Sequence, residues 1–148
     1  MNTVVIDADI AIKWVVEEDG TQEALALRRR SELVAPDLLA VECANILWKK
    51  VQREELSKDE ALLAARLLQA ADIEFLPTRS LLEAATRIAV ELNHPAYDCL
   101  YIALAVERDC RFITADERFV RKLRQQRRHR LQHKIVSLAE AAREWDSE

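Results

Sequence analysis

Residues 3–9 read Thr-Val-Val-Ile-Asp-Ala-Asp, and this stretch decides the fold that the rest of the chain is expected to adopt. A short, unbroken apolar run rich in β-branched residues is typical of a buried strand in a parallel sheet. The run ends in two carboxylates, Asp7 and Asp9. Ligands of open α/β sheets bind beyond the carboxyl ends of the strands, where the strand order reverses. The opening of the chain therefore predicts a functional site at Asp7, with Asp9 beside it.

Strands and helices alternate along the remainder of the sequence. Three S-x-x-E sequences, starting at Ser57, Ser80 and Ser137, read as capping boxes, and Pro36 fits the first position of a helix. Strands are predicted at 33–35, 73–76, 111–116 and 135–136, and helices at 10–16, 21–32, 36–53, from 57, at 80–93, from 95 and from 137. This alternation predicts one α/β domain over residues 1–148, with a parallel sheet covered by helices on both faces.

Apolar spacing indicates which side chains enter the core. The helix from residue 57 is expected to bury Leu62, Leu63, Leu67, Leu68 and Ala71. Tyr97 and Tyr101 are expected to be core aromatics, because they lie four residues apart in an apolar helix.

Composition excludes several classes of protein. The 148 residues include a single glycine, Gly20, so the chain cannot form a glycine-rich phosphate-binding loop. No apolar run approaches the roughly 20 residues that span a bilayer, and no signal-peptide pattern opens the sequence, so we expect a cytoplasmic protein. Cys43, Cys99 and Cys110 form no CxxC pair and are expected to be buried free thiols.

Two further carboxylates interrupt apolar helices. Glu42 is the only charge between Leu38 and Trp48, and Asp98 is the only charge between Ala96 and Val106. A lone buried carboxylate costs roughly several kcal/mol unless it is paired or bound to metal. A salt bridge for Glu42 and helix capping by Asp98 are the structural alternatives.

Strand ends and helix starts meet at one edge of a parallel sheet. Asp7, Glu42, Asp98 and Asp116 are therefore expected to converge there. Four unpaired carboxylates repel one another, and Mg²⁺ or Mn²⁺, which prefer oxygen ligands, would relieve that repulsion. Such an ion lowers the pKa of a bound water and neutralises charge on a leaving oxygen, which suits phosphodiester hydrolysis. His129 and His133 lack the intervening glutamate of a HExxH zinc site.

Charge is distributed unevenly along the chain. The formal net charge is −4, but the segment from 121 to 134 holds seven basic residues and no acid, leaving −11 on the rest. Such a segment suits a polyanion such as RNA or an acidic protein, with a solvated surface as the structural alternative. The candidate RNA-binding residues are Arg121, Lys122, Arg124, Arg127, Arg128 and Arg130.

Four motifs together resemble the PIN-domain family, and within it the VapC-type ribonuclease toxins of toxin–antitoxin pairs. They are VVIDADIAIKWVVEE, APDLLAVECANILWK, AYDCLYIALA and FITADERF, which begin at residues 4, 35, 96 and 112. The resemblance implies a compact three-layer α/β/α sandwich and RNA cleavage that depends on Mg²⁺ or Mn²⁺. It also implies a homodimer and a small cognate antitoxin that blocks the site, within a module that inhibits translation.

The family's functional acids fall on positions of this sequence that already stand out. The resemblance implies that the catalytic and metal-binding residues are Asp7, Glu42, Asp98 and Asp116. It implies that Thr114 orients Asp116 or a metal-bound water, and that Asn45 supports Glu42. Many members carry a small hydroxyl residue where this chain has Asp9, which would then be an extra ligand, an outer acceptor or a drain on activity. The basic segment exceeds what the family pattern requires.

Two rival functions remain at this level. The Asp7-Ala-Asp9 strand end also fits a haloacid-dehalogenase-type phosphohydrolase, in which the first aspartate is a covalent nucleophile. The chain lacks the paired late acids of that chemistry. A catalytically degenerate PIN-like module that only binds RNA or a partner is the non-enzymatic rival.

Overall fold

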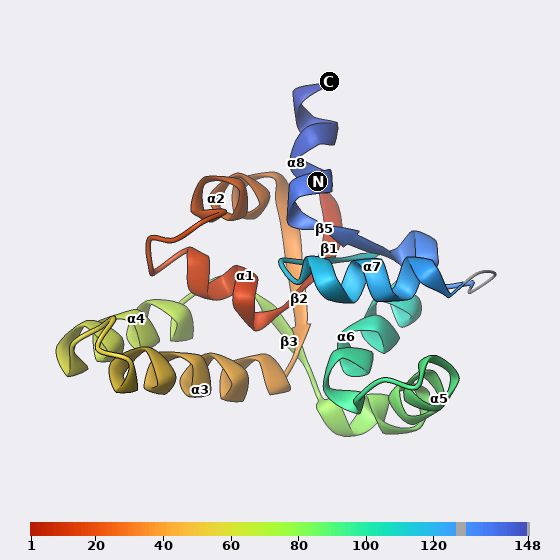
Figure 1. Ribbon diagram of the computed structural model, residues 1–148, viewed down its shortest axis with the longest axis horizontal. Helices are drawn as coiled ribbons and strands as arrows, with labels where there is room; N and C mark the ends of the chain where they lie inside the picture. Colours follow the sequence, from red (N-terminus) through yellow and green to blue (C-terminus); the bar gives the residue numbers. More distant parts are fainter. Residues whose placement is uncertain (127–129, 148) are drawn as a thin grey trace.

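The centre of the fold is a parallel sheet. The structure is a computed structural model that describes residues 1–126 and 130–147. Within these residues five parallel strands pair in the order β3-β2-β1-β4-β5 (Figure 1). They are β1 (Asn2–Ile6), β2 (Ser31–Pro36), β3 (Glu74–Leu76), β4 (Arg111–Thr114) and β5 (Ile135–Ser137). The predicted parallel sheet is confirmed.

Helices cover both faces of the sheet. They are α1 (Ala8–Lys13), α2 (Thr21–Arg30), α3 (Leu38–Gln52), α4 (Lys58–Gln69), α5 (Leu82–Leu92), α6 (Ala96–Glu107), α7 (Glu117–Gln125) and α8 (Leu138–Asp146), with the 3-10 helices η1 (Thr78–Leu81) and η2 (Gln132–Lys134). Helices α1–α4 lie on one side of the sheet and α5–α7 on the other (Figure 1). The predicted three-layer α/β/α arrangement is confirmed.

The strand order reverses between β1 and β4. The chain moves outward from β1 through β2 to β3 and then returns to pair β4 with the free side of β1, with Ile6 opposite Ile113. This is the switch point at which open α/β folds form ligand sites. Asp7 follows β1 directly, and Asp116 follows β4 after one intervening residue.

Helix α6 is the most deeply buried helix in the described part of the chain. Every residue from Cys99 to Ala105 is buried, and the helix packs against β1, β2 and β4. Tyr101 stacks on Phe112 of β4, with 5.4 Å between ring centroids. The helix start, which carries Asp98, is therefore fixed relative to the sheet edge.

Several predicted boundaries were wrong by a few residues. Pro36 ends β2 and does not open the next helix, because its backbone pairs with Leu76 of β3. The opening strand stops at Ile6, since the Asp7 side chain caps helix α1. The strand predicted over 111–116 likewise stops at Thr114, where Asp116 caps α7.

The capping predictions had mixed outcomes. Ser57 and Glu60 form the full reciprocal box. Ser137 caps α8 through the N–H of Glu140, but the Glu140 carboxylate binds Arg124 instead of completing the box. Ser80 is no cap: its hydroxyl donates to the Pro77 carbonyl within η1.

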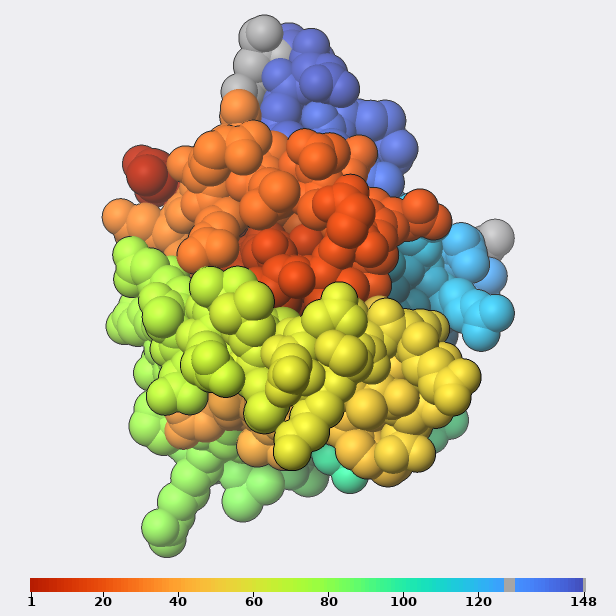
Figure 2. All heavy atoms as spheres, turned by 90° about the vertical axis from the view of Figure 1, so that its left-hand side faces the viewer, coloured from red at the N-terminus to blue at the C-terminus, as the bar shows by residue number. Residues whose placement is uncertain are grey.

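The predicted inward face of α4 was partly wrong. Leu68 is buried, but Leu62, Leu63 and Leu67 are 45–54% exposed. Helix α4 lies across the surface seen in Figure 2, where it covers α3 and leaves its outer side uncovered. Periodicity marked an apolar face correctly, but nothing in the described chain packs on it.

Other side chains also departed from their predicted environments. Tyr101 is buried as predicted, whereas Tyr97 is 66% exposed. All three cysteines are free; Cys43 and Cys99 are buried and Cys110 is half-buried. In the described residues no helix is long and apolar enough to cross a membrane.

Candidate active site

Asp7 is the most buried acid of the sheet edge. Its side chain is 9% exposed, and one carboxylate oxygen accepts the N–H of Ile10 at 3.1 Å. Burial, with the nearby charge of Asp9 as the second cause, raises the pKa of Asp7 from 3.8 to about 7. Asp7 therefore exchanges a proton near neutral pH, which is unusual for a carboxylate that caps a helix.

Thr114 joins the two strand-end acids. Its buried hydroxyl donates to Asp7 Oδ2 at 2.5 Å and accepts the backbone N–H of Asp116 at 3.0 Å. Asp116 itself caps α7 by accepting the N–H of Phe119 at 3.1 Å. The hydroxyl thus positions the Asp7 carboxylate and the Asp116 backbone together, whereas the family resemblance implied only that it orients Asp116 or a metal-bound water.

Glu42 reaches the site from the second turn of α3. Tyr101 of α6 donates its hydroxyl in a short hydrogen bond to Glu42 Oε1. Partial burial raises the pKa of Glu42, while that hydrogen bond opposes the rise. The predicted partner Asn45 is exposed and makes no hydrogen bond to Glu42 within the described chain, so its supporting role stays a prediction. Tyr101 was missed because 59 residues separate it from Glu42.

Asp98 stands in the first turn of α6, as predicted. Its Oδ2 lies 2.6 Å from Nε2 of His94, and Nδ1 of His94 lies 2.9 Å from the Lys122 ammonium. The N-cap of α6 is Pro95, so capping is not the role of Asp98. His94 was not predicted as a partner of Asp98, although the two residues are four apart in the sequence.

Asp9 lies two residues beyond Asp7 and is exposed. Loss of solvation raises the pKa of Asp9. The Lys13 ammonium opposes this rise, whereas the charges of Asp116, Glu18 and Asp98 add to it. Lys13 makes its own ion pair with Glu18 at 3.2 Å. Asp9 therefore belongs to the same electrostatic neighbourhood as the four predicted acids.

The charge of Asp98 acts on three other acids of the group. It contributes to the raised pKa of Asp7, of Asp9 and of Glu42, although Asp7 and Asp9 follow β1 and Glu42 lies in α3. In residues 1–126 and 130–147, neither Asp7, Glu42 nor Asp116 forms an ion pair with a lysine or arginine. Like charges without cations in a partly buried place are unfavourable, so the arrangement favours a bound cation.

The acids are not assembled into a finished metal site. Among the described residues no group of three or more His, Cys, Asp or Glu is arranged so that it could hold an ion. The donor set nonetheless fits a hard divalent cation, because it consists of carboxylate oxygens and offers no thiolate or free imidazole.

The basic segment divides into engaged and free side chains. Arg124 forms a bidentate pair with Glu140, both contacts at 2.7 Å, and Lys134 binds Asp109 at 2.6 Å. Arg130 lies 4.0 Å from Glu91, and Lys122 is held by His94. Arg121 is exposed and makes no ion pair within the described residues; Arg127, Arg128 and His129 lie outside them. Among the described candidate RNA-binding residues, Arg124 and Arg130 are thus paired with acids within the fold, whereas Arg121 is not.

Comparison with known proteins agrees with the fold. The PIN domain family model matches residues 4–124. Ribonuclease VapC3 of Pyrobaculum aerophilum is 32% identical over 125 residues, covering 80% of this chain and 93% of that protein. A crystal structure of PAE2754 from the same organism superposes with a TM-score of 0.71 at 17% identity, covering 99% of this chain and 91% of that one.

A further solved structure concerns an assembly. VapBC2 from Rickettsia felis, bound to a DNA fragment from its promoter, matches with a TM-score of 0.61 at 11% identity, covering 91% of this chain and 98% of that one. At such identities the two structures establish the fold alone, whereas the family model extends over the motifs that carry the acids. The chain therefore belongs to the PIN-domain family, among its VapC ribonucleases.

Proposed function

We propose that this protein is an endoribonuclease that needs Mg²⁺ or Mn²⁺, and that it is the toxin of a type II toxin–antitoxin pair that inhibits translation in the cytoplasm. The observation that carries the proposal is that Asp7, Glu42 and Asp116, near the switch point between β1 and β4, form no ion pair with a lysine or arginine in the described residues. The similarity to VapC ribonucleases supports the choice of RNA as substrate. Membership of the PIN family argues against the phosphohydrolase alternative.

The ligands of the ion would be Asp7, Asp98 and Asp116, with Glu42 at the side of the site. When bound, such an ion supplies water activation and neutralises charge on the phosphodiester. Because no three of the described acids are arranged to hold an ion in this structure, their side chains would have to turn to share one.

The surrounding side chains prepare the acids for this role. The Thr114 hydroxyl keeps Asp7 Oδ2 in place, and the Tyr101 hydroxyl keeps Glu42 in place. Asp7, with its pKa near 7, would lose its proton as an ion binds, since metal binding requires the ionised form. Asp9 would act as an outer acceptor, because it is exposed whereas Asp7 beside it is buried.

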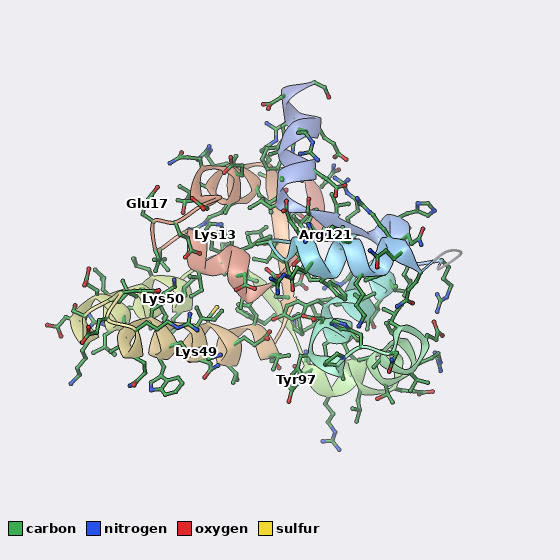
Figure 3. The ribbon with its side chains drawn as sticks, in the orientation of Figure 1. Lys13, Glu17, Lys49, Lys50, Tyr97 and Arg121 are labelled. Atoms are coloured by element: carbon green, nitrogen blue, oxygen red, sulfur yellow. The ribbon has the colours of Figure 1, made fainter. Side chains whose placement is uncertain are left out.

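RNA would approach between the two helical layers. Lys13 of α1 and Lys49 and Lys50 of α3 lie to one side, and Arg121 of α7 lies to the other (Figure 3). Lys50 is held by Glu18 and Glu55, whereas Lys49 and Arg121 are exposed. Exposed cations on both sides would bind the phosphates that flank the cleaved bond.

A cognate antitoxin would bind the groove between α3 and α4. The groove encloses about 300 Å³ and is lined mainly by apolar side chains, among them Leu47, Ala65 and Phe75. A slender amphipathic helix fits such a groove. Ala44→Glu would place a charge in it; we expect that variant to cleave RNA normally but to escape neutralisation by co-expressed antitoxin.

A second copy of the chain would cover the outer surface of α5. Leu82 and Val90 of this helix are 64% and 77% exposed. Exposed apolar side chains of this size mark protein contacts when they gather on one element. Val90→Glu is expected to convert a dimer to a monomer in light-scattering measurements, while Val90→Thr is not.

The test of the enzymatic function is cleavage of a mixed RNA pool, with the new ends mapped by sequencing. We expect wild-type protein to cleave with Mg²⁺ or Mn²⁺ and to stop when a chelator is added, and Asp98→Asn to be inactive. Asp109→Asn is the matched control, because Asp109 is exposed, paired with Lys134 and located before β4. Equal activity of wild type and Asp98→Asn would contradict the proposal, and RNA binding without cleavage by wild type would favour the degenerate binding module.

A further inference from the structure

We infer that His94 and Lys122 form a positioning relay that fixes the Asp98 carboxylate for metal binding. The inference rests on the proposed function, because it assigns Asp98 as a ligand. It adds two side chains that neither touch the substrate nor bind the ion, and that act only through Asp98.

The contacts form a continuous chain. The Lys122 ammonium lies 2.9 Å from His94 Nδ1, and His94 Nε2 lies 2.6 Å from Asp98 Oδ2. Both contacts are within hydrogen-bonding distance. The other carboxylate oxygen of Asp98 has no hydrogen bond within the described chain, so it remains available to an ion.

The chemistry of the three groups fixes the direction of the hydrogen bonds. A lysine ammonium has three donors and no acceptor, so Nδ1 of His94 must accept and therefore carries no proton. The ring proton then lies on Nε2, which donates to Asp98. Lys122 thus selects the tautomer that can hold the carboxylate, in the way that outer partners orient metal ligands elsewhere.

The imidazole is held from three sides. Its ring centroid lies 4.5 Å from that of Phe119, and its side chain is only 14% exposed. Lys122 also donates to the Asn93 carbonyl at 3.2 Å, which ties α7 to the turn before α6. Phe119 and Lys122 are three residues apart on one face of α7. The ring therefore has little freedom to turn away from Asp98.

The relay also couples two acids of the site. Helix α7 begins at the Asp116 cap, where the N–H of Phe119 binds the carboxylate, and one turn later it presents Lys122 to His94. Asp98 and Asp116 are thus oriented by the same helix, although Asp98 lies in α6 and Asp116 follows β4. A shift of α7 would move both.

The competing role for Lys122 is a direct contact with RNA phosphate. The two roles differ in what they change. Loss of a phosphate contact raises KM for RNA in a salt-dependent way and leaves metal affinity unchanged. Loss of a positioning contact weakens metal binding even when no RNA is present.

The experiment is calorimetric titration of Mn²⁺, without RNA, into the protein and into variants at His94, Lys122 and Asp98. His94→Leu removes the donor to Asp98, and His94→Gln restores one. We expect His94→Leu to weaken Mn²⁺ binding about 10- to 100-fold, the range found for partners of metal ligands. His94→Gln should recover most of the loss, and circular dichroism will check folding.

Lys122 provides a second test on an exposed residue. We expect Lys122→Met to weaken Mn²⁺ binding about tenfold, and the same change to have no further effect in the His94→Gln background, because the tautomer no longer matters there. Nitrogen-15 spectra of the neutral imidazole should show the proton on Nε2 in wild type and a mixture of both tautomers in Lys122→Met.

Three results would overturn the relay. These are Mn²⁺ affinity in His94→Leu equal to wild type, an Nδ1–H tautomer in wild type, or a Lys122→Met defect confined to KM for RNA. If Asp98→Asn loses Mn²⁺ binding while His94→Leu keeps it, only the relay fails. If wild type binds no Mn²⁺ and cleaves no RNA, the proposed function fails, and the relay fails with it.

Discussion

Charged side chains near the amino end of the sheet form ion pairs, whereas Asp7 and Glu42 at its carboxyl end form none in the described residues. At the amino end, Arg111 forms a bidentate pair with Glu144 at 2.9 Å, and Arg108 binds Glu74 at 2.6 Å. At the carboxyl end, Asp7 and Glu42 have no lysine or arginine partner in the described chain, and each has a raised pKa. The fold thus pairs opposite charges at one edge of the sheet and, within the described residues, brings together unpaired acids at the other.

The difference teaches where function lies. Ion pairs at the amino end need no ligand, because each charge already has its counterpart. The acids at the carboxyl end are destabilising until something positive joins them, and such groups mark sites of chemistry. If this account is right, changes at the two ends must have different effects on activity and on stability.

Removal of an acid at the carboxyl end is expected to have the largest effect. Asp7→Asn and Glu42→Gln should each reduce RNA cleavage by about a thousandfold, since the ion supplies several kcal/mol of charge stabilisation. Both changes preserve shape, so thermal melting should show a folded protein. Glu144→Gln is the matched change at the amino end, and a comparable loss of activity in that variant would erase the contrast.

The raised pKa of Asp7 gives a stability effect of defined sign. In the unfolded chain Asp7 ionises near 3.8, but in the fold it keeps its proton to about pH 7. The native state therefore binds more protons than the unfolded state between these values, and its stability falls as pH rises through this window.

Asp7→Asn should abolish that loss. Without metal, the variant is expected to exceed wild type in unfolding free energy at pH 8 by roughly 2–4 kcal/mol, taking 1.36 kcal/mol per pKa unit as the upper bound. The advantage should shrink toward pH 4. Urea titrations across this range measure it, and a variant less stable than wild type at pH 8 would count against a buried, proton-binding Asp7.

Tyr101→Phe tests the support of Glu42 with a smaller effect. The phenyl ring keeps the stacking on Phe112 but removes the donor to Glu42. We expect about a tenfold fall in cleavage rate. Because the hydrogen bond lowers the pKa of Glu42, its loss should also shift the acidic limb of the pH–rate profile to higher pH. An unchanged pH–rate profile would mean that Tyr101 does not support Glu42 in the reaction.

The exposed cation Arg121 should affect RNA affinity alone. We expect Arg121→Gln to make the slope of log K against log salt for RNA binding less steep. The change should be about 0.7, the value for one phosphate contact on a single strand. Arg124→Gln is the comparison, because Arg124 is already paired with Glu140 and should leave the slope unchanged. If both variants had the same slope, Arg121 would be a solvated surface residue and not an RNA contact.

The smallest effect is expected at the amino end. A double-mutant cycle on Arg111 and Glu144 should give a coupling of about 0–1 kcal/mol, because the pair is largely exposed. A coupling as large as the Asp7 effect would mean that the two ends do not differ as described.

Much of the site could be predicted because its signal is local. Glu42 and Asp98 stand alone in apolar helices, and Asp7 ends an apolar strand, so each is visible in about ten residues of sequence. Strand order then brings them to one edge without further information. The site residues themselves remain a proposal that awaits the variants above.

The partners of those acids could not be predicted, because they come from distant parts of the chain. Thr114 reaches Asp7 across 107 residues, and Tyr101 reaches Glu42 across 59. Asn45 was chosen for Glu42 because it shares a helix face, but the packing of α6 supplied a different donor. Leu63 shows the same limit: helical spacing gives an apolar face but not whether another element covers it.

The most direct test of the central claim is a calorimetric titration of Mn²⁺ into wild-type protein and Asp98→Asn, without RNA. The account predicts saturable binding by wild type, with proton release near pH 6.5 as Asp7 ionises, and a loss of that binding in Asp98→Asn. Equal affinity in both proteins, or no binding by wild type, would contradict the claim that these acids gather around a divalent cation.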